Sequence, residues 1–360
     1  MLFDPDKQRA QIVGTGLVGG SIGMGLRRCG WRVTGCDTDP ARERRALELG
    51  AIDQAGSDGD ALITFVAVPA GAVACTARRV LHSLPPAGVV TDVAGVKAPV
   101  VAAVGDPRFV GGHPMAGSEQ NGVEGSSPDM FEGATWVLTP QTDTDPVAFA
   151  TVRAVVSSLG ANVVEMPASR HDDLVALVSH VPHLTAATLM NLAAESALEH
   201  ATLLRLAAGG FRDMTRIAAG EPAIWPDVCV ENRDGILDVL DRLLGALGDV
   251  RRIVAGGDRE SLLATLERAR EARINLPAGV PASDQSSEVR VPVHDRPGVL
   301  AEVTTLLGEM GVNIYDLEIA HSAEGDRGVL VLVVDSAATE RVRAALLARG
   351  FRCSVRMLGG

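Results

Sequence analysis

The chain contains 360 residues, of which 46% are hydrophobic and 22% charged, and it carries a formal net charge of −12. This length exceeds one typical compact domain and predicts two or three domains with cores of their own. No run rich in Lys and Arg breaks the acidic balance, which excludes the electrostatic footprint of a protein that binds nucleic acid or anionic membranes. We expect partners among small molecules and proteins.

Cysteine usage and hydropathy indicate the compartment. The five cysteines (Cys29, Cys36, Cys75, Cys229 and Cys353) have neither a CxxC motif nor paired spacing, which predicts reduced, buried thiols. The first residues lack the apolar segment of a signal peptide, and no stretch reaches the roughly 18 uninterrupted apolar residues of a bilayer span. We therefore expect a soluble, cytoplasmic protein that does not enter a membrane.

From Gln11 to about Met166, short Val/Ile-rich runs alternate with helical stretches rich in Ala, Arg and Leu. This alternation is typical of a doubly wound parallel sheet, and it predicts an α/β dinucleotide-binding domain of the Rossmann type over residues 1–167. The predicted strands are Gln11–Val13, Arg32–Gly35, Leu62–Val68, Val89–Asp92, Phe109–Gly111, Trp136–Leu138 and Asn162–Glu165.

A GxGxxG motif follows the first predicted strand and opens a helix. In this motif Gly14 permits the tight turn, Gly16 lets a pyrophosphate approach the backbone, and Gly19 allows the helix to pack closely on the strand. The second strand ends at Asp37, whose carboxylate would accept hydrogen bonds from a ribose and repel a 2′-phosphate. This favours NAD, although three nearby arginines leave NADP open: Arg42, Arg44 and Arg45. The predicted NAD-binding residues are Gly14, Gly16, Leu17, Gly19, Asp37, Val68 and Pro69.

The candidate base is His113, which follows an apolar run and precedes a glycine-rich loop. Open parallel sheets bind ligands at the carboxyl ends of their strands, where this side chain should project. There it could take the proton from a substrate hydroxyl as hydride leaves for the nicotinamide. A buried structural histidine is the alternative.

Residues 168–277 show long helical periodicity and predict an all-helical domain. This region carries His171, His180 and His183 with Ser179, and later Arg216, a set suited to a dicarboxylate substrate. Arg216 could hold a carboxylate with two hydrogen bonds, unless it forms a surface ion pair. The histidines could instead pack or cap helices. Because no HExxH or Cys/His pattern is present, we predict no metal site.

A stretch rich in Pro, Gly and Ser predicts a linker over residues 278–288. Beyond it, residues 289–360 follow the order strand, helix, strand, strand, helix, strand, which is the ferredoxin-like βαββαβ unit. The predicted elements are Val289–Val293, Val299–Met310, Ile314–Ala320, Val329–Val334, Ala337–Arg349 and Cys353–Met357.

Four motifs, taken in order, resemble the prephenate/arogenate dehydrogenase family over roughly the first 280 residues. They are the nucleotide run, HPMAGSE at His113–Glu119, HDDLVALVSHVPH at His171–His183 and GGFRDMTRIA at Gly209–Ala218. The resemblance implies NAD-dependent oxidative decarboxylation of prephenate to 4-hydroxyphenylpyruvate, in tyrosine biosynthesis, by a homodimer formed through the helical domain.

The same resemblance assigns roles to residues. His113 corresponds to the acceptor of the hydrogen bond from the substrate's ring hydroxyl, and Arg216 to the arginine that holds a substrate carboxylate. Ser179 and His183 line the substrate pocket, and we include His171 and His180 with them. One departure stands out, because Gly95 occupies a position where the family usually has a serine that helps to orient the histidine. Water or another residue must replace it, or His113 is held less tightly.

The last 70 or so residues resemble the ACT domain through HDRPGVL at His294–Leu300 and GVNI at Gly311–Ile314. In that family the residues matching Gly298 and Asn313 lie where an amino acid binds between paired modules. An aromatic amino acid, L-tyrosine first and L-phenylalanine second, is the expected effector. A purely structural module is the alternative.

Three other functions stay open. A β-hydroxy acid dehydrogenase typically uses a lysine in its second domain, and no lysine occurs between Arg170 and Ile274. A dehydrogenase for arogenate or for 4-amino-4-deoxyprephenate would share all the motifs, although we favour prephenate. Gly95 could also indicate a non-catalytic amino-acid sensor.

Overall fold

The computed structural model describes residues 8–116, 120, 122–199, 207–275, 286–294, 296–321 and 327–358. The chain forms two compact units, of which the first comprises Met1–Leu204 with Met214–Leu247. The second comprises Arg205–Asp213 with Gly248–Gly360. The expected linker lies largely outside the described residues, as do three residues of the HPMAGSE motif, Gly117–Glu119.

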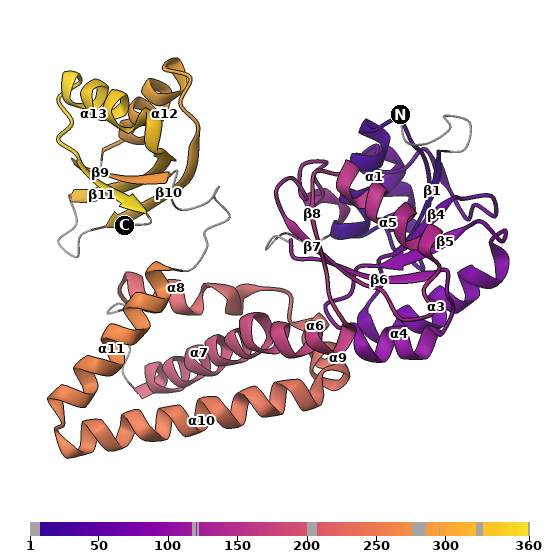
Figure 1. Cartoon of the computed structure of the whole chain (residues 1–360), viewed down its shortest axis with the longest axis horizontal. Helices are drawn as coiled ribbons and strands as arrows, with labels where there is room; N and C mark the ends of the chain where they lie inside the picture. Colours follow the sequence, from indigo (N-terminus) through magenta and orange to yellow (C-terminus); the bar gives the residue numbers. More distant parts are fainter. Residues whose placement is uncertain are drawn as a thin grey trace. The chain divides into compact units, whose positions relative to one another are not determined.

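An eight-stranded sheet forms the core of the first unit, in the order β3-β2-β1-β4-β5-β6-β7-β8 (Figure 1). Chain order reverses between the neighbouring strands β1 and β4, so the sheet is doubly wound and has its topological switch point there. The strands are β1 (Arg9–Val13), β2 (Arg32–Cys36), β3 (Gln54–Ala55), β4 (Ile63–Val66), β5 (Val89–Asp92), β6 (Phe109–Pro114), β7 (Thr135–Thr139) and β8 (Asn162–Glu165).

All seven predicted strands are present in this sheet, with two differences from the prediction. The short strand β3 pairs with β2 in the structure and was not predicted, because its two exposed residues carry no apolar signal. Strands β1 to β6 are parallel, but β7 runs antiparallel to β6, with His113 opposite Val137. The predicted doubly wound sheet is confirmed, and its parallel order is interrupted at the β6–β7 pair.

Helices cover both faces of the sheet, because successive strand residues point to opposite sides. Ile12 and Phe65 join a core with α1 (Leu17–Arg28) and α5 (Pro146–Ser158). Their neighbours Val13 and Val66 join a second core with α3 (Ala70–Ser83) and α4 (Ala98–Val104). The remaining helix of this part, α2 (Pro40–Glu48), begins at Asp39, whose side chain accepts a hydrogen bond from the Ala41 N–H. Strands buried on both faces account for the continuous apolar runs in the sequence.

The described residues from 168 to 275 contain no strand, as predicted. Within the first unit, a small core of Ala176, Val181, Ile236 and Val239 joins the helices. The elements of the region are α6 (Ala168–Val175), the π-helical turn η3 (Ala176–His180), α7 (Val181–Glu199), α8 (Gly209–Thr215), the 3-10 turns η5 (Arg216–Ala219) and η6 (Pro222–Ile224), α9 (Trp225–Glu231), α10 (Arg233–Gly256) and α11 (Arg259–Ile274). In the part of the chain that the structure describes, no helix has the length and hydropathy to cross a membrane.

The C-terminal region confirms the βαββαβ order in an antiparallel sheet, β10-β11-β9-β12. Its strand β9 already begins at Ser286, so Ser286 and Ser287 pair in the sheet instead of belonging to the linker. The elements are β9 (Ser286–His294), α12 (Val299–Glu309), β10 (Ile314–His321), β11 (Arg327–Asp335), α13 (Thr339–Ala348) and β12 (Ser354–Leu358). A separate core, including Val291, Val303 and Leu332, holds this region together.

The cysteines are free thiols, as predicted, but the expectation that they are buried is wrong. Cys29 and Cys75 are exposed, whereas Cys36, Cys229 and Cys353 are partly buried. Packing in the described cores is carried by Val, Ala, Leu, Ile and a few aromatic residues instead.

Candidate active site

The dinucleotide motif lies at the switch point, where β1 ends. Gly14 has a φ of +95°, and a Cβ there would lie 2.2 Å from the Ala67 oxygen. A Cβ at Gly19 would lie 1.9 Å from the Gly14 oxygen, so both positions require glycine. At Gly16 a Cβ would meet nothing within 4 Å, which leaves space above the backbone. Leu17 begins α1 without a capping side chain, so this helix end can accept an anion such as a pyrophosphate.

Asp37 is held in place by its neighbours. Its Oδ2 accepts a hydrogen bond of 2.9 Å from the Thr15 N–H, and its Oδ1 accepts one of 3.0 Å from the Asp39 N–H. Two of the arginines that left NADP open are engaged elsewhere: Arg42 lies 3.7 Å from Asp39, and Arg45 pairs at 3.1 Å with both Glu48 and Glu124. A fixed acid beside the motif fits the ribose of NAD.

Two further residues of this edge connect β4 with α3. Val68 is partly buried and its Cγ1 lies 3.3 Å from the position of a Cβ on Gly14, and the exposed Pro69 precedes the first residue of α3. The structure thus gathers all seven predicted nucleotide-binding residues at the ends of β1, β2 and β4. The residues present fit a dinucleotide with an unphosphorylated ribose.

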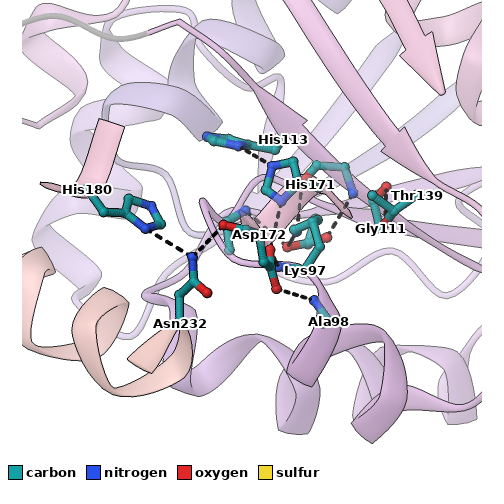
Figure 2. A network of polar contacts seen from close by, with 12 residues as sticks. Lys97, Ala98, Gly111, His113, Thr139, His171, Asp172, His180 and Asn232 are labelled. Atoms are coloured by element: carbon teal, nitrogen blue, oxygen red, sulfur yellow. Dashed lines mark hydrogen bonds and ion pairs between the residues drawn. The ribbon is translucent and has the colours of Figure 1, made fainter. Parts of the chain in front are cut away.

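His113 lies near the carboxyl end of β6 and is only partly exposed (Figure 2). Its Nδ1 is 2.9 Å from the Nε2 of His171. Burial, followed by the influence of His171, Lys97 and His180, lowers the pKa of His113 well below 6.5. The imidazole is therefore neutral at pH 7, which is the state a general base requires.

Behind His113 the polar contacts continue to a carboxylate. His171 is 1% exposed, and its Nδ1 lies 2.7 Å from Asp172 Oδ1. Asp172 also accepts hydrogen bonds of 2.8 Å from the Lys97 N–H and 2.7 Å from the Ala98 N–H, at the start of α4. Asp172 therefore joins α6 to α4 and to the histidine pair.

A buried ion pair fixes the strand that carries His113. Lys97 Nζ contacts Asp92 Oδ2 and donates a hydrogen bond of 2.8 Å to the Gly112 oxygen, and both side chains are fully buried. Asp92 Oδ1 accepts a hydrogen bond of 3.0 Å from the Gly112 N–H. Burial lowers the pKa of Lys97, while the charge of Asp92 opposes this effect. The pair ties β5 to β6 at the residue before His113.

Gly95 faces the other nitrogen of the histidine. A Cβ at this position would lie 3.7 Å from both Nε2 and Cε1 of His113, at ordinary contact distance. Among the described residues, none forms a hydrogen bond with Nε2. The position where the resemblance expects a serine therefore adjoins Nε2, and His113 is oriented through Nδ1 by His171 instead.

The helical residues of the predicted site lie in different surroundings. His180 is buried in the π-helical turn η3, with its Nδ1 3.2 Å from Asn232 Nδ2, and burial lowers its pKa to about 4. π-Helical turns inside helices often mark functional sites. His183 stacks on Trp225 with ring centres 3.7 Å apart, and burial lowers its pKa. Ser179 is partly buried.

Arg216 begins the turn η5 and is exposed. At the end of that turn, a Cβ on Gly220 would lie 3.8 Å from His183 Cε1, so the turn packs beside α7. The structure brings His113, His171 and His180 into one region with Asn232 (Figure 2). It places His183 beside the Arg216 turn on the helical side.

Family comparisons match three consecutive parts of the chain. The first is the prephenate dehydrogenase nucleotide-binding domain, over residues 22–165, and the second is the prephenate dehydrogenase dimerization domain, over residues 167–268. The third is the ACT domain, over residues 287–351. The chain belongs to the prephenate dehydrogenase family. It is accordingly an NAD-dependent dehydrogenase with a dimerisation domain and a C-terminal ACT domain.

Relatives of this family align over most of the chain. Prephenate dehydrogenase from Bacillus subtilis is 33% identical over 90% of this chain and 91% of its own length. Cyclohexadienyl dehydrogenase from Zymomonas mobilis is 32% identical over 74% of this chain and 94% of its own length. A crystal structure of prephenate dehydrogenase from A. aeolicus, in complex with hydroxyphenyl propionate and NAD+, is 30% identical, covers 75% of this chain and 98% of that one, and has a TM-score of 0.71.

The helical part of this family member carries an apolar cavity of about 560 Å³. Leu177, Val181, Leu189, Met214 and Leu243 are among its lining residues, and His113 is not. Exposed apolar side chains continue on the same helices, for example Leu192 and Leu244. An apolar surface of this kind suits a contact between subunits better than a polar dicarboxylate.

Sequence reasoning missed four residues of the network: Asp92, Lys97, Asp172 and Asn232. Asp92 and Lys97 lie at the two ends of the stretch in which the sequence analysis singled out only Gly95. Asp172 follows His171 in HDD, a pattern that is also ordinary on a solvated helix face. Asn232 lies 60 residues from Asp172 in the sequence, and its Nδ2 donates a hydrogen bond of 2.9 Å to the backbone oxygen of Asp172.

Proposed function

We propose that the chain catalyses NAD-dependent oxidative decarboxylation of prephenate to 4-hydroxyphenylpyruvate, with His113 as the general base. One observation carries this proposal: a neutral histidine at the carboxyl edge of a sheet with a dinucleotide motif, its Nε2 bonded to no described residue. In an open α/β sheet this edge is where cofactor and substrate meet.

The chemistry follows from the position of His113. Bound NAD supplies the hydride acceptor for the ring carbon that bears the hydroxyl. His113 Nε2 takes the hydroxyl proton, and carbon dioxide leaves as the ring becomes aromatic. Aromatisation drives the reaction, so the protein contributes mainly positioning and proton withdrawal.

Substrate recognition is assigned to the helical side. Arg216 holds a substrate carboxylate with two hydrogen bonds, and Ser179 and His183 line the pocket. The place of the Arg216 turn beside His183 supports this assignment. His180 and His171 were expected in the same pocket, but their burial and their bonds to Asn232 and Asp172 favour a supporting role.

Prephenate is favoured over arogenate and the amino analogue by the relatives named prephenate dehydrogenase, such as that of Bacillus subtilis. A structural neighbour from Synechocystis, 29% identical with a TM-score of 0.64, is an arogenate dehydrogenase. NAD reduction should be measured with prephenate, arogenate and 4-amino-4-deoxyprephenate separately. We expect the highest kcat/KM with prephenate. A higher kcat/KM with either amine would identify that amine as the substrate instead. No NAD reduction with any of the three compounds would favour the non-catalytic amino-acid sensor.

We also propose that L-tyrosine, or secondarily L-phenylalanine, binds the ACT domain at Gly298 and Asn313 of a homodimer. Gly298 has a φ of +89° and directly precedes α12, and a Cβ there would meet nothing within 4 Å. Asn313 is exposed just before β10. A backbone open at a helix start can receive a ligand carboxylate.

A further inference from the structure

We propose that His171 and Asp172 form a proton relay that fixes the tautomer of His113 and receives charge from it during turnover. This inference rests on the proposed role of His113 as the base. Both residues are buried behind His113 and act through it, so they are positioning residues. They orient His113 in this chain, where Gly95 has no side chain to do so.

The hydrogen-bond directions follow from Asp172. Its two carboxylate oxygens accept hydrogen bonds from the backbone N–H groups of Lys97 and Ala98. An ionised carboxylate only accepts, so the His171 Nδ1 at 2.7 Å must donate to it. When His171 carries a single proton, that proton is on Nδ1 and Nε2 is bare.

The second histidine follows from the first. His171 Nε2, being an acceptor, requires the His113 Nδ1 at 2.9 Å to be the donor. A neutral imidazole carries one proton, so the Nε2 of His113 is bare. That nitrogen is the one beside Gly95, where a Cβ would lie 3.7 Å away. The carboxylate thus determines, across two rings, which nitrogen of His113 can accept a proton.

The same contacts also allow the positive charge that forms on His113 to move to His171. When Nε2 takes the hydroxyl proton, the Nδ1 proton can pass to His171 Nε2, which leaves His113 neutral and His171 positive. The positive ring then lies against the Asp172 carboxylate. The O–H bond breaks, one N–H forms at His113 Nε2, and one N–H is exchanged between the rings, so no other reactant is required.

The surrounding charges favour this direction of transfer. Burial and the neighbouring Lys97 and His180 disfavour a positive charge on His113, and Asp92 lies in its buried pair with Lys97. His171 has the compensating acid in direct contact. A lone buried histidine would have to keep the proton at a site whose environment opposes it.

The tautomer can be observed in the protein without substrate. Nitrogen-15 NMR of histidine-labelled enzyme distinguishes protonated from bare ring nitrogens, and the His113→Asn spectrum identifies the His113 signals. We expect His113 protonated at Nδ1 and bare at Nε2 at pH 7.5. A proton on Nε2 instead would overturn the relay, whatever the enzyme's activity.

Substitutions test its contribution to turnover. Asp172→Asn removes the negative charge that stabilises a positive His171, and should lower kcat by about 10²- to 10⁴-fold with little change in KM. The exposed neighbour provides a matched control, since Asp173→Asn removes the same charge and should leave kcat unchanged. The acid limb of the kcat/KM profile should move to lower pH in Asp172→Asn only, because loss of the carboxylate disfavours the protonated pair.

A second variant covers the case in which Asp172→Asn does not fold. The Oε1 of the new residue in His171→Gln can still accept from His113 Nδ1 but cannot carry a proton. We expect a fall in kcat smaller than in His171→Leu, which removes the acceptor altogether. Equal and wild-type kcat in both variants would refute the relay, whereas a wild type inactive with every substrate would refute the proposed function and leave the NMR result to decide.

Discussion

Two regions of the first compact unit provide the proposed site, and they are built differently. At the sheet edge, His113 belongs to a chain of bonds through His171, Asp172 and the start of α4. On the helical side, Arg216 is exposed on a short 3-10 turn. A base with fixed orientation contributes in the transition state, whereas an arginine on a turn contributes to holding the substrate. Variants of the sheet edge should therefore change mainly kcat, and variants of the helical side should change mainly KM.

The largest effect is expected at the sheet edge. His113→Asn removes the proton acceptor and should lower kcat by about 10²- to 10⁴-fold, with a smaller change in substrate binding. Steady-state NAD reduction with prephenate measures both. Near-normal turnover would show that His113 is not the base and that the two regions do not differ in the way proposed.

Arg216→Ala should have the complementary effect. Loss of the charged partner of a substrate carboxylate costs on the order of 2–5 kcal/mol, which should appear mainly as a higher KM for prephenate. Arg216→Lys keeps the charge but not the two-pronged geometry, and should lie between wild type and Arg216→Ala. If KM stays unchanged in both, Arg216 has a structural role.

A variant of Asp37 tests whether the sheet edge selects NAD over NADP. Asp37→Ser removes the carboxylate that Thr15 and Asp39 hold in place and should improve the use of NADP relative to NAD. The ratio of kcat/KM for the two cofactors is the measurement. A wild type that already prefers NADP would show the interpretation of Asp37 to be wrong.

The pH profile reports the state of His113. Its pKa is lowered below 6.5 and the neutral form is the active one, so activity should persist as pH falls through 6.5. It should be lost only below that value, when the ring is protonated. We would measure kcat/KM for prephenate from pH 5 to 9 in buffers of constant ionic strength, with stability checked at each end. An acid limb well above 6.5 would contradict the neutral, buried base.

The smallest change in turnover is expected from removing the ACT domain. The Zymomonas mobilis relative aligns over 94% of its length with 74% of this chain, so that relative is shorter than this chain. A chain ending near Pro277 should remain dimeric, keep its kcat and lose inhibition by L-tyrosine. Asn313→Ala in the full chain tests the effector site alone. Undiminished inhibition of the truncated enzyme would place tyrosine in competition at the His113 site.

Much of the fold was predictable, because local patterns determine it. The glycine motif, the apolar runs and the helical periodicity identified the sheet, the helical region and the βαββαβ unit. The direction of β7 was not predictable, since Thr135–Thr139 has the same apolar character in either orientation. The two-residue β3 has no pattern of its own and depends on pairing with β2.

The site was predictable only where a residue's chemistry is carried by its neighbours in sequence. His113 follows a strand and precedes glycines, and Asp37 ends a strand, so both were found. Asp172 was missed because its partners Lys97 and Ala98 lie 75 and 74 residues away. Gly95 was recognised as a departure, but only the structure shows that His171 holds the histidine from its other side.

The most direct test of the central claim is the stoichiometry of the reaction with prephenate and NAD. We predict one NADH, one carbon dioxide and one 4-hydroxyphenylpyruvate for each prephenate consumed, with the rates of formation of all three lowered together by about 10²- to 10⁴-fold in His113→Asn. Consumption of prephenate without NADH, or NADH formed at the wild-type rate by His113→Asn, would contradict it.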